Sequence, residues 1–297
     1  MAKITVIGTG GVGACIAFEL AHRALCRELV LIDIVTNLAE GNAMDISHAT
    51  QAVQVKAGSY KDMADSDIVI VTAGRPRSPD MKSRLELASF NAGIIKNIAE
   101  EIRQYAPKSI VITLTNPVDT MNYMMYRHTG FERSRVIGFS GELDSARFRT
   151  IVAPNKPQDI EAYVMGEHGD SQVPVFSRLR QKEKFLILSK EEKEELIKKC
   201  RNSSTEVISR KGATVFAPAH HTISMVEAIL WDKMKLMMCS AVLDGEYGQS
   251  GLSIGVPCII GKKGILKVEE WKLPQDEQKM FIDSVLNLKS SIRELFR

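Results

Sequence analysis

An apolar run followed at once by three glycines opens the chain. Ile4 to Ile7 has the Ile- and Val-rich composition of a buried strand. Gly8, Gly10 and Gly13 follow in the pattern Gly-x-Gly-x-x-Gly, and the stretch from Ile16 to Ala21 is compatible with a helix. A strand, a glycine-rich turn and a helix in this order predict an α/β unit in which backbone amides at the helix N-terminus face an anionic group.

The three glycines each have a mechanical role in such a turn. Gly8 allows the tight turn, Gly10 lets the backbone approach a pyrophosphate, and Gly13 permits close packing of the helix on the strand. A dinucleotide is therefore expected to contact the whole turn, which consists of Gly8, Thr9, Gly10, Gly11, Val12 and Gly13.

Asp33 indicates which dinucleotide this is. It lies 20 residues beyond Gly13, at the end of the second apolar run, where a carboxylate can bind the hydroxyls of the adenosine ribose. Its charge would repel the ribose phosphate of NADP, and no arginine immediately follows it to offset that repulsion. NAD is the predicted cofactor. A flavin, or a glycine-rich turn in an unrelated α/β protein, is the alternative.

Further short apolar runs continue through the first half of the chain. Helical patterns lie between them, for example Ile95, Ile98 and Ile102, whose spacing aligns apolar side chains on one face. Alternating strands and helices predict an α/β fold, with a Rossmann-type doubly wound parallel sheet over residues 1–140. The further expected strands are Leu29 to Ile32, Ile68 to Val71, Ile110 to Leu114 and Val136 to Phe139.

The second half is less regular, and we expect residues 141–297 to form a mixed α/β catalytic domain. Ser189 with Glu192 three residues later is a capping-box pattern, which predicts a helix running towards Gly212. A last helix is expected to dock on the core through an apolar face formed by Phe281, Val285, Leu288, Ile292 and Leu295.

Charge and cysteine content exclude several classes of partner. The net charge of +3 arises from 39 basic and 36 acidic residues spread along the chain, which argues against nucleic acid and anionic membranes as partners. No apolar run approaches the roughly 20 residues that span a bilayer, and a cytoplasmic location is expected. The sequence contains no Cys-x-x-Cys pair that could bind a metal. The cysteines are therefore expected to be reduced thiols that pack in the core; they are Cys15, Cys26, Cys200, Cys239 and Cys258.

A second set of short motifs occurs along the rest of the chain. In order and spacing they resemble the lactate/malate dehydrogenase family from residue 4 to about residue 260, and within it the malate dehydrogenases of lactate-dehydrogenase-like type. The motifs are Thr72-Ala73-Gly74, Pro76-Arg77, Ser83-Arg84-Leu85, Thr115-Asn116-Pro117-Val118-Asp119, Leu143-Asp144-Ser145-Ala146-Arg147, Gly166-Glu167-His168-Gly169-Asp170-Ser171, Gly245-Glu246-Tyr247-Gly248 and Gly255-Val256-Pro257.

The chemistry of this family assigns a role to each motif. Reduction of a 2-oxo acid needs a hydride donor, a proton donor, an anchor for the carboxylate and positive charge near the carbonyl oxygen. His168 is the expected acid/base, because imidazole titrates near neutral pH. The resemblance places Asp144 on the far ring nitrogen, where it fixes the tautomer and stabilises the imidazolium. Alone, His168 could be a surface residue and Asp144 a helix cap; together in this order they indicate catalysis.

The resemblance also implies the binding residues. Arg147 would clamp the substrate carboxylate through two parallel hydrogen bonds, Asn116 would position the carbonyl, and Thr214 would line the far side of the substrate pocket. Asn91 would contact the cofactor ribose. The remaining residues expected near the cofactor are Thr72, Ala73, Gly74, Leu114, Thr115 and Asn116.

The segment after Gly74 is expected to form a mobile loop that reads the substrate side chain. By resemblance, Arg77 pairs with a second carboxylate, as in malate, and Arg84 polarises the carbonyl. Two departures leave the loop register open: Arg84 follows Arg77 one residue later than in the family pattern, and Asp80 stands where malate enzymes usually carry glycine. Arg75 or Lys82 could therefore take over one of the loop roles.

The function that follows is reversible oxidation of (S)-malate to oxaloacetate with NAD, without a metal, by an enzyme acting on a small dicarboxylate. Lactate, or a broader range of 2-oxo acids, is the alternative substrate. An NAD-binding regulator is the non-enzymatic alternative, which the presence of His168 and Arg147 disfavours. An NAD-dependent glycoside hydrolase that uses a metal is a third alternative, but it would need metal-binding Cys and His residues in the second half, where the sequence shows no convincing set. The family assembles as dimers or tetramers, so a homo-oligomer is expected.

Overall fold

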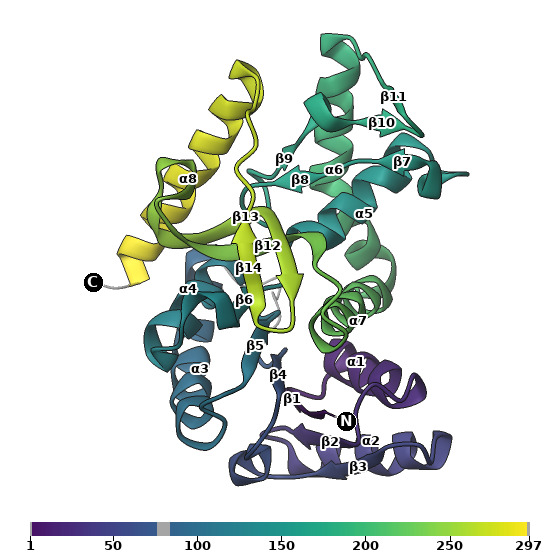
Figure 1. Cartoon of the computed structure of the whole chain (residues 1–297), viewed down its shortest axis with the longest axis vertical. Helices are drawn as coiled ribbons and strands as arrows, with labels where there is room; N and C mark the ends of the chain where they lie inside the picture. The colour runs from purple at the N-terminus through teal and green to yellow at the C-terminus, as the bar shows by residue number, and fades with distance from the viewer. Residues whose placement is uncertain (1, 76–83, 296–297) are drawn as a thin grey trace.

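A nine-stranded sheet runs through the middle of the protein (Figure 1). The computed structural model describes residues 2–75 and 84–295, the side chains of residues 84 and 85 excepted. The strand order is β14-β13-β12-β6-β5-β4-β1-β2-β3. From one edge to the other these strands are β14 (Gly264–Val268), β13 (Ser250–Gly261), β12 (Lys235–Asp244), β6 (Val136–Gly138), β5 (Ile110–Thr113), β4 (Ile68–Val71), β1 (Lys3–Ile7), β2 (Glu28–Ile32) and β3 (Gln54–Ala57).

The strands β1 to β6 all pair in parallel, in the order 3-2-1-4-5-6. This is the doubly wound arrangement that the alternating apolar runs predict. The strands expected from those runs are present: the prediction for β4 is exact, and each of the others differs by one residue at one end. The half-exposed edge strand β3 was not expected, because its sequence Gln-Val-Lys-Ala has no apolar run.

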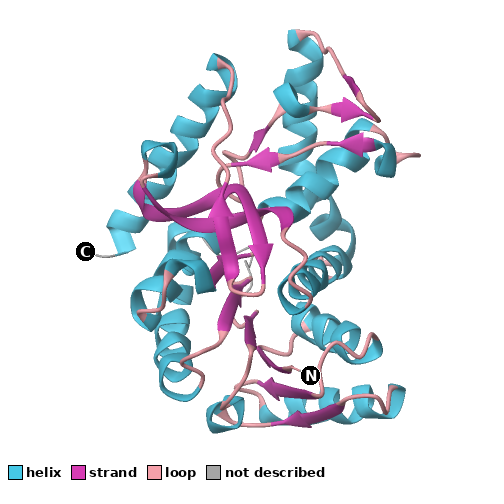
Figure 2. Ribbon diagram, in the orientation of Figure 1, coloured by secondary structure: helices cyan, strands magenta, loops and turns pink. Residues whose placement is uncertain are grey.

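Helices cover both faces of this parallel sheet (Figure 2). Ile68 and Ile70 pack with α1 and α2, whereas Val69 and Val71 pack with α3 and α4. The alternation explains why β4, with the sequence Ile-Val-Ile-Val, is apolar at every position, since both of its faces are buried. The four helices are α1 (Gly11–His22), α2 (Thr36–Ala49), α3 (Arg84–Tyr105) and α4 (Val118–Thr129).

The second half of the chain adds antiparallel strands to the same sheet. β12 pairs with β6, and β13 and β14 continue outward from it. A smaller layer beside them contains α5 (Gly141–Val152), α6 (Lys190–Lys211), α7 (Phe216–Leu230) and the short strands β7 (Ile160–Glu161), β8 (Val164–Met165), β9 (Val173–Pro174), β10 (Arg180–Gln181) and β11 (Lys184–Phe185). The long β12–β13 hairpin is the main feature of this half that the sequence patterns did not predict.

Both helices predicted in the second half are present. Ser189 caps α6, because its hydroxyl accepts from Glu192 N at 3.2 Å and its own amide donates to the Glu192 carboxylate at 2.7 Å. The last helix, α8 (Gln275–Leu295), buries Phe281, Val285, Leu288 and Ile292. Within residues 2–75 and 84–295, no helix is long and apolar enough to cross a membrane.

Candidate active site

The glycine-rich turn lies between β1 and α1, against the end of β4. Gly8 has φ +92°, and a Cβ there would lie 2.6 Å from Ala73 Cα. A Cβ at Gly13 would lie 2.7 Å from the Thr72 hydroxyl, which itself donates to Gly8 O at 2.7 Å. A Cβ at Gly10 would meet nothing within 4 Å. Gly8 and Gly13 therefore allow close backbone packing, and Gly10 leaves open space at the N-terminus of α1.

Asp33 closes one side of this turn. Its Oδ2 accepts from the amide of Thr9 at 2.6 Å and from the Thr9 hydroxyl at 3.1 Å, and its Oδ1 accepts from Val35 N at 2.9 Å. Asn42 on α2 donates to Thr9 O at 2.9 Å, a support that has no motif in the sequence. Open space at Gly10, free amides at a helix N-terminus and a carboxylate at the end of β2 fit a dinucleotide.

Asn91 on α3 joins the loop after β4 to the loop after β5. Its Oδ1 accepts from Arg75 N at 2.8 Å, and its Nδ2 donates to Asn116 O at 2.7 Å. Its side chain is buried, so its contact with a cofactor ribose stays a prediction. Thr115 donates to Ala73 O at 2.6 Å, which fixes the segment after β5 against the segment after β4.

His168 and Arg147 meet on one buried carboxylate. His168 Nδ1 lies 2.6 Å from Asp144 Oδ2, and the Arg147 guanidinium donates to Asp144 Oδ1 at 3.1 Å. Asp144 is 3% exposed, whereas the side chains of Arg147 and His168 are 16% and 19% exposed. Because Nδ1 faces the carboxylate, Nε2 is the ring nitrogen left for a substrate.

The electrostatics of this trio favour a charged imidazole. Burial disfavours the charged ring, but the Asp144 carboxylate outweighs it and raises the pKa of His168 above its usual value. Burial likewise works against the Asp144 carboxylate, but His168 and Arg147 outweigh it and lower its pKa. The arrangement can thus hold a proton on His168 near neutral pH and pass it through Nε2.

The loop that carries His168 is held along its backbone. Gly166 exchanges hydrogen bonds of 2.8 and 3.1 Å with Gly255 on β13, and the Glu167 amide donates to the Ser284 hydroxyl on α8 at 2.7 Å. The His168 amide donates to Asp119 Oδ2 on α4 at 2.7 Å. Asp119 and Gly255 belong to motifs of the sequence, but no local sequence pattern predicts that they contact this loop.

The other expected substrate residues are placed less fully. Asn116 is exposed, and Thr214 is half-buried at the junction of α6 and α7. That junction lies beside the glycine-rich turn, since a Cβ at Gly11 would be 3.3 Å from Val215 Cγ2. Arg77, with the rest of 76–83, lies outside the described residues, and so does the side chain of Arg84.

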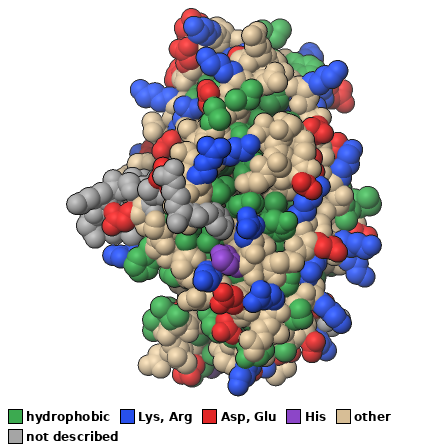
Figure 3. All heavy atoms as spheres, turned by 90° about the vertical axis from the view of Figure 1, so that its left-hand side faces the viewer, with side chains coloured by type: hydrophobic (Ala, Val, Ile, Leu, Met, Phe, Trp, Pro, Cys, Tyr) green, Lys and Arg blue, Asp and Glu red, His purple; other side chains and the backbone are tan. Residues whose placement is uncertain are grey.

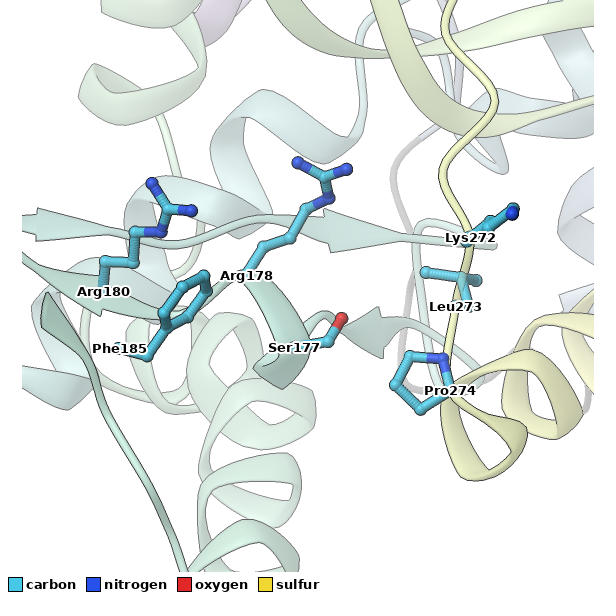
Figure 4. A pocket seen from close by; sticks show the side chains of 7 residues that line it. All are labelled: Ser177, Arg178, Arg180, Phe185, Lys272, Leu273 and Pro274. Atoms are coloured by element: carbon cyan, nitrogen blue, oxygen red, sulfur yellow. The ribbon is translucent and has the colours of Figure 1, made fainter. Parts of the chain in front are cut away.

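A surface pocket of about 410 Å³ lies elsewhere, between β10, β11 and the segment before α8 (Figure 4). It contains none of the residues expected to act in the reaction, and its lining is Ser177, Arg178, Arg180, Phe185, Lys272, Leu273 and Pro274. Over the face shown in Figure 3, basic and acidic side chains are interspersed. In the part of the chain that the structure describes, no group of three His, Cys, Asp or Glu residues is placed to hold a metal ion.

The fold and site define an NAD-dependent 2-hydroxy-acid oxidoreductase. Residues 2–138 match the model for the lactate/malate dehydrogenase NAD binding domain, and residues 141–297 match that for the lactate/malate dehydrogenase alpha/beta C-terminal domain. The chain belongs to the lactate/malate dehydrogenase family.

Individual relatives carry both names of the family. The malate dehydrogenase of Haloferax volcanii is 40% identical, over 99% of this chain and 100% of the relative. The structure of Cryptosporidium parvum malate dehydrogenase has a TM-score of 0.94 and 34% identity, over 99% of each chain. The Cryptosporidium parvum lactate dehydrogenase, complexed with lactic acid and β-nicotinamide adenine dinucleotide, also has a TM-score of 0.94 and 34% identity, over 100% of this chain and 98% of that one.

Proposed function

We propose that the protein is a malate dehydrogenase, which oxidises (S)-malate to oxaloacetate reversibly with NAD. The observation that carries this proposal is the contact of His168 and Arg147 with one buried carboxylate, Asp144, because it unites a proton-transfer group with a carboxylate-binding group. The malate dehydrogenase of Haloferax volcanii, 40% identical over the full length, supports malate over lactate.

The residues around the glycine-rich turn would hold NAD. The amides at the start of α1 would face its phosphates across the open space at Gly10, and Asp33 would accept from its adenosine ribose. When bound, NAD supplies a hydride acceptor at the nicotinamide ring. The segments at Thr72–Gly74 and Leu114–Asn116 would border that ring, and we propose that residues 1–140 act as the NAD-binding domain.

The proton step belongs to His168. In oxidation, neutral His168 takes the hydroxyl proton of malate on Nε2 as the hydride leaves C2, and Asp144 stabilises the imidazolium that forms. In the reverse direction the imidazolium returns this proton to the carbonyl oxygen. Arg147 keeps N–H donors beyond the one on Asp144, and these would bind the substrate carboxylate next to C2.

The second carboxylate of the substrate distinguishes malate from lactate. We propose that Arg77 binds it and that Arg84 polarises the carbonyl, two roles that rest on the sequence motif. Pyruvate would leave Arg77 without a counter-charge, and an uncompensated charge in a closed site costs more than the ~1–3 kcal/mol of an ordinary unsatisfied polar group.

We test the substrate by following NADH oxidation with oxaloacetate and pyruvate in parallel. We expect a strong preference for oxaloacetate, and in Arg77→Gln a loss of about 100-fold or more in kcat/KM for oxaloacetate alone. Arg103→Gln, an exposed position on α3, is the matched control and should behave as the wild type. A preference for pyruvate would mean that Arg77 is not in the pocket, and turnover of neither acid would contradict the proposal.

We also propose that the chain forms a homo-oligomer. Large apolar side chains remain exposed on the single chain, including Ile34 at 96%, Ile187 at 95% and Phe216 at 72%. Single exposed apolar side chains also occur on monomers, so the proposal rests on the resemblance to a family that assembles as dimers or tetramers. Light scattering of the purified protein tests this, and a monomer mass at assay concentration would contradict it.

A further inference from the structure

Asp119 is a second carboxyl group in direct contact with the proton-transfer residue. It is the second residue of α4 and is 1% exposed. Its Oδ2 accepts from the backbone amide of His168 at 2.7 Å, across 49 residues of sequence. Its Oδ1 is also buried and has no hydrogen-bond partner among the described residues. Burial of a carboxyl group with a single ordered contact costs free energy of folding. We therefore look for a function in that contact, which is to the backbone of His168.

Two neighbouring strands bring two carboxyls to the same histidine. β5 leads into α4 with Asp119, and its parallel neighbour β6 leads into α5 with Asp144. Asp144 contacts the ring at Nδ1, while Asp119 contacts the main chain. Together the two contacts fix both the position of the backbone and the rotation of the ring, which set the direction of Nε2.

We propose that Asp119 is a positioning residue for proton transfer, which anchors the backbone of His168 and, when ionised, adds negative charge that favours its imidazolium form. This inference rests on the proposed dehydrogenase function only for its kinetic consequence. The anchor and the charge are properties of the protein without substrate.

The charged groups around His168 determine how its pKa should change when the Asp119 charge is removed. Asp144 and Arg147 face it from α5, Asp119 faces it from α4, and Glu167 precedes it in its own loop. Ser240 on β12 contributes a hydroxyl near Asp119 but no charge. Both Asp144 and Asp119 raise the pKa of His168, whereas Arg147 lowers it. Removal of the Asp119 charge should therefore lower the pKa of His168.

A merely structural role is the alternative. Asp119 lies in the first turn of α4, where any carboxylate interacts favourably with the helix dipole. Such a role would change stability and leave the pH dependence of the reaction as it is. The pH profile therefore separates the two roles.

The kinetic test compares Asp119→Asn, which keeps an acceptor oxygen but no charge, with Asp119→Ala, which keeps neither. For oxaloacetate reduction we expect kcat to fall about tenfold in Asp119→Asn and about 100-fold in Asp119→Ala, with KM changed by less than about twofold. The pH above which reduction slows should move down in Asp119→Asn, since reduction needs protonated His168. Thr129→Val removes a buried hydroxyl that bonds to carbonyls of α4 and to the Phe131 amide just after it, and should leave these parameters unchanged.

An NMR titration tests the same link without turnover. In protein labelled at its six histidines, the His168 amide proton should shift with the ionisation of Asp119, and this shift should be absent in Asp119→Asn. The His168 ring should titrate at lower pH in the variant. Wild-type kcat and pH profile in Asp119→Asn, or an unchanged ring titration, would overturn the inference. If the wild-type protein is inactive but the Asp119→Asn substitution still lowers the pH at which the His168 ring titrates, the proposed function is contradicted and this inference stands.

Discussion

At the scale of the residue, the chemistry depends on how Asp144 perturbs His168. Because the carboxylate stabilises the imidazolium, His168 stays protonated to a higher pH than a free imidazole would. Asp144→Asn removes this charge and favours the other tautomer, so kcat/KM for oxaloacetate should fall by about 100-fold or more. The pH above which reduction slows should also move down. Rates measured across pH test this, and an unchanged profile would show that Asp144 does not set the pKa of His168.

Asp119 should cost the protein stability above neutral pH. Burial is the main cause that raises its pKa from an unfolded value of 3.8 to about 7, although the nearby Ser240 hydroxyl and the hydrogen bond from the His168 amide oppose the shift. The folded state therefore holds this proton when the unfolded state has lost it, and stability declines as pH rises from about 4 to about 7.

Asp119→Asn cannot ionise, so its free energy of unfolding should not share this decline. The difference in free energy of unfolding, variant minus wild type, should be about 1–4 kcal/mol larger at pH 8 than at pH 5. Urea unfolding of both proteins at the two pH values measures this difference. An equal difference at both would mean that Asp119 is charged in the folded state at both. A gain in stability with a loss of activity would mark a residue kept for function.

At the scale of the element, two glycines of one turn should fail differently. Gly13→Ala places a Cβ against Gly8 O and 2.7 Å from the Thr72 hydroxyl, so it should destabilise the fold by about 1–3 kcal/mol. Gly10→Ala meets no atom within 4 Å at φ −66° and ψ −170°, so its stability should be unchanged or up to ~1 kcal/mol higher.

NADH affinity should fall in Gly10→Ala by about tenfold or more, because the methyl group occupies the space into which the pyrophosphate is expected to come. Thermal unfolding and fluorescence titration with NADH, applied to both variants, separate the two effects. Equal loss of stability in both variants would contradict the distinct roles of the two glycines.

Elements with a strict pattern could be predicted from sequence, and elements without one could not. The inner strands of the parallel sheet are mostly apolar because helices cover both faces, and α6 begins at its capping box. β3 lacks this signal because it is a half-exposed edge strand. The β12–β13 hairpin lacks it because its partners are distant in sequence, and its residues also resemble other buried segments.

At the scale of the whole molecule, the sheet explains why only part of the candidate site could be predicted from the sequence. Asp144 and His168 could be paired by resemblance, and the structure places them 2.6 Å apart. The anchors of the His168 loop come from α4, β13 and α8, which only the complete fold brings together. Asn42 and Asn91 likewise act on backbone atoms across long sequence distances.

One isotope experiment tests the central claim that this chain transfers a hydride between malate and NAD. The protein is incubated with NAD and (S)-malate that carries deuterium at C2, and the NADH formed is analysed by mass spectrometry, with His168→Gln alongside. We predict deuterated NADH from the wild type and a much slower reaction in the variant, because the hydroxyl proton then has no acceptor. Unlabelled NADH, no NADH, or an equally fast variant would contradict the account.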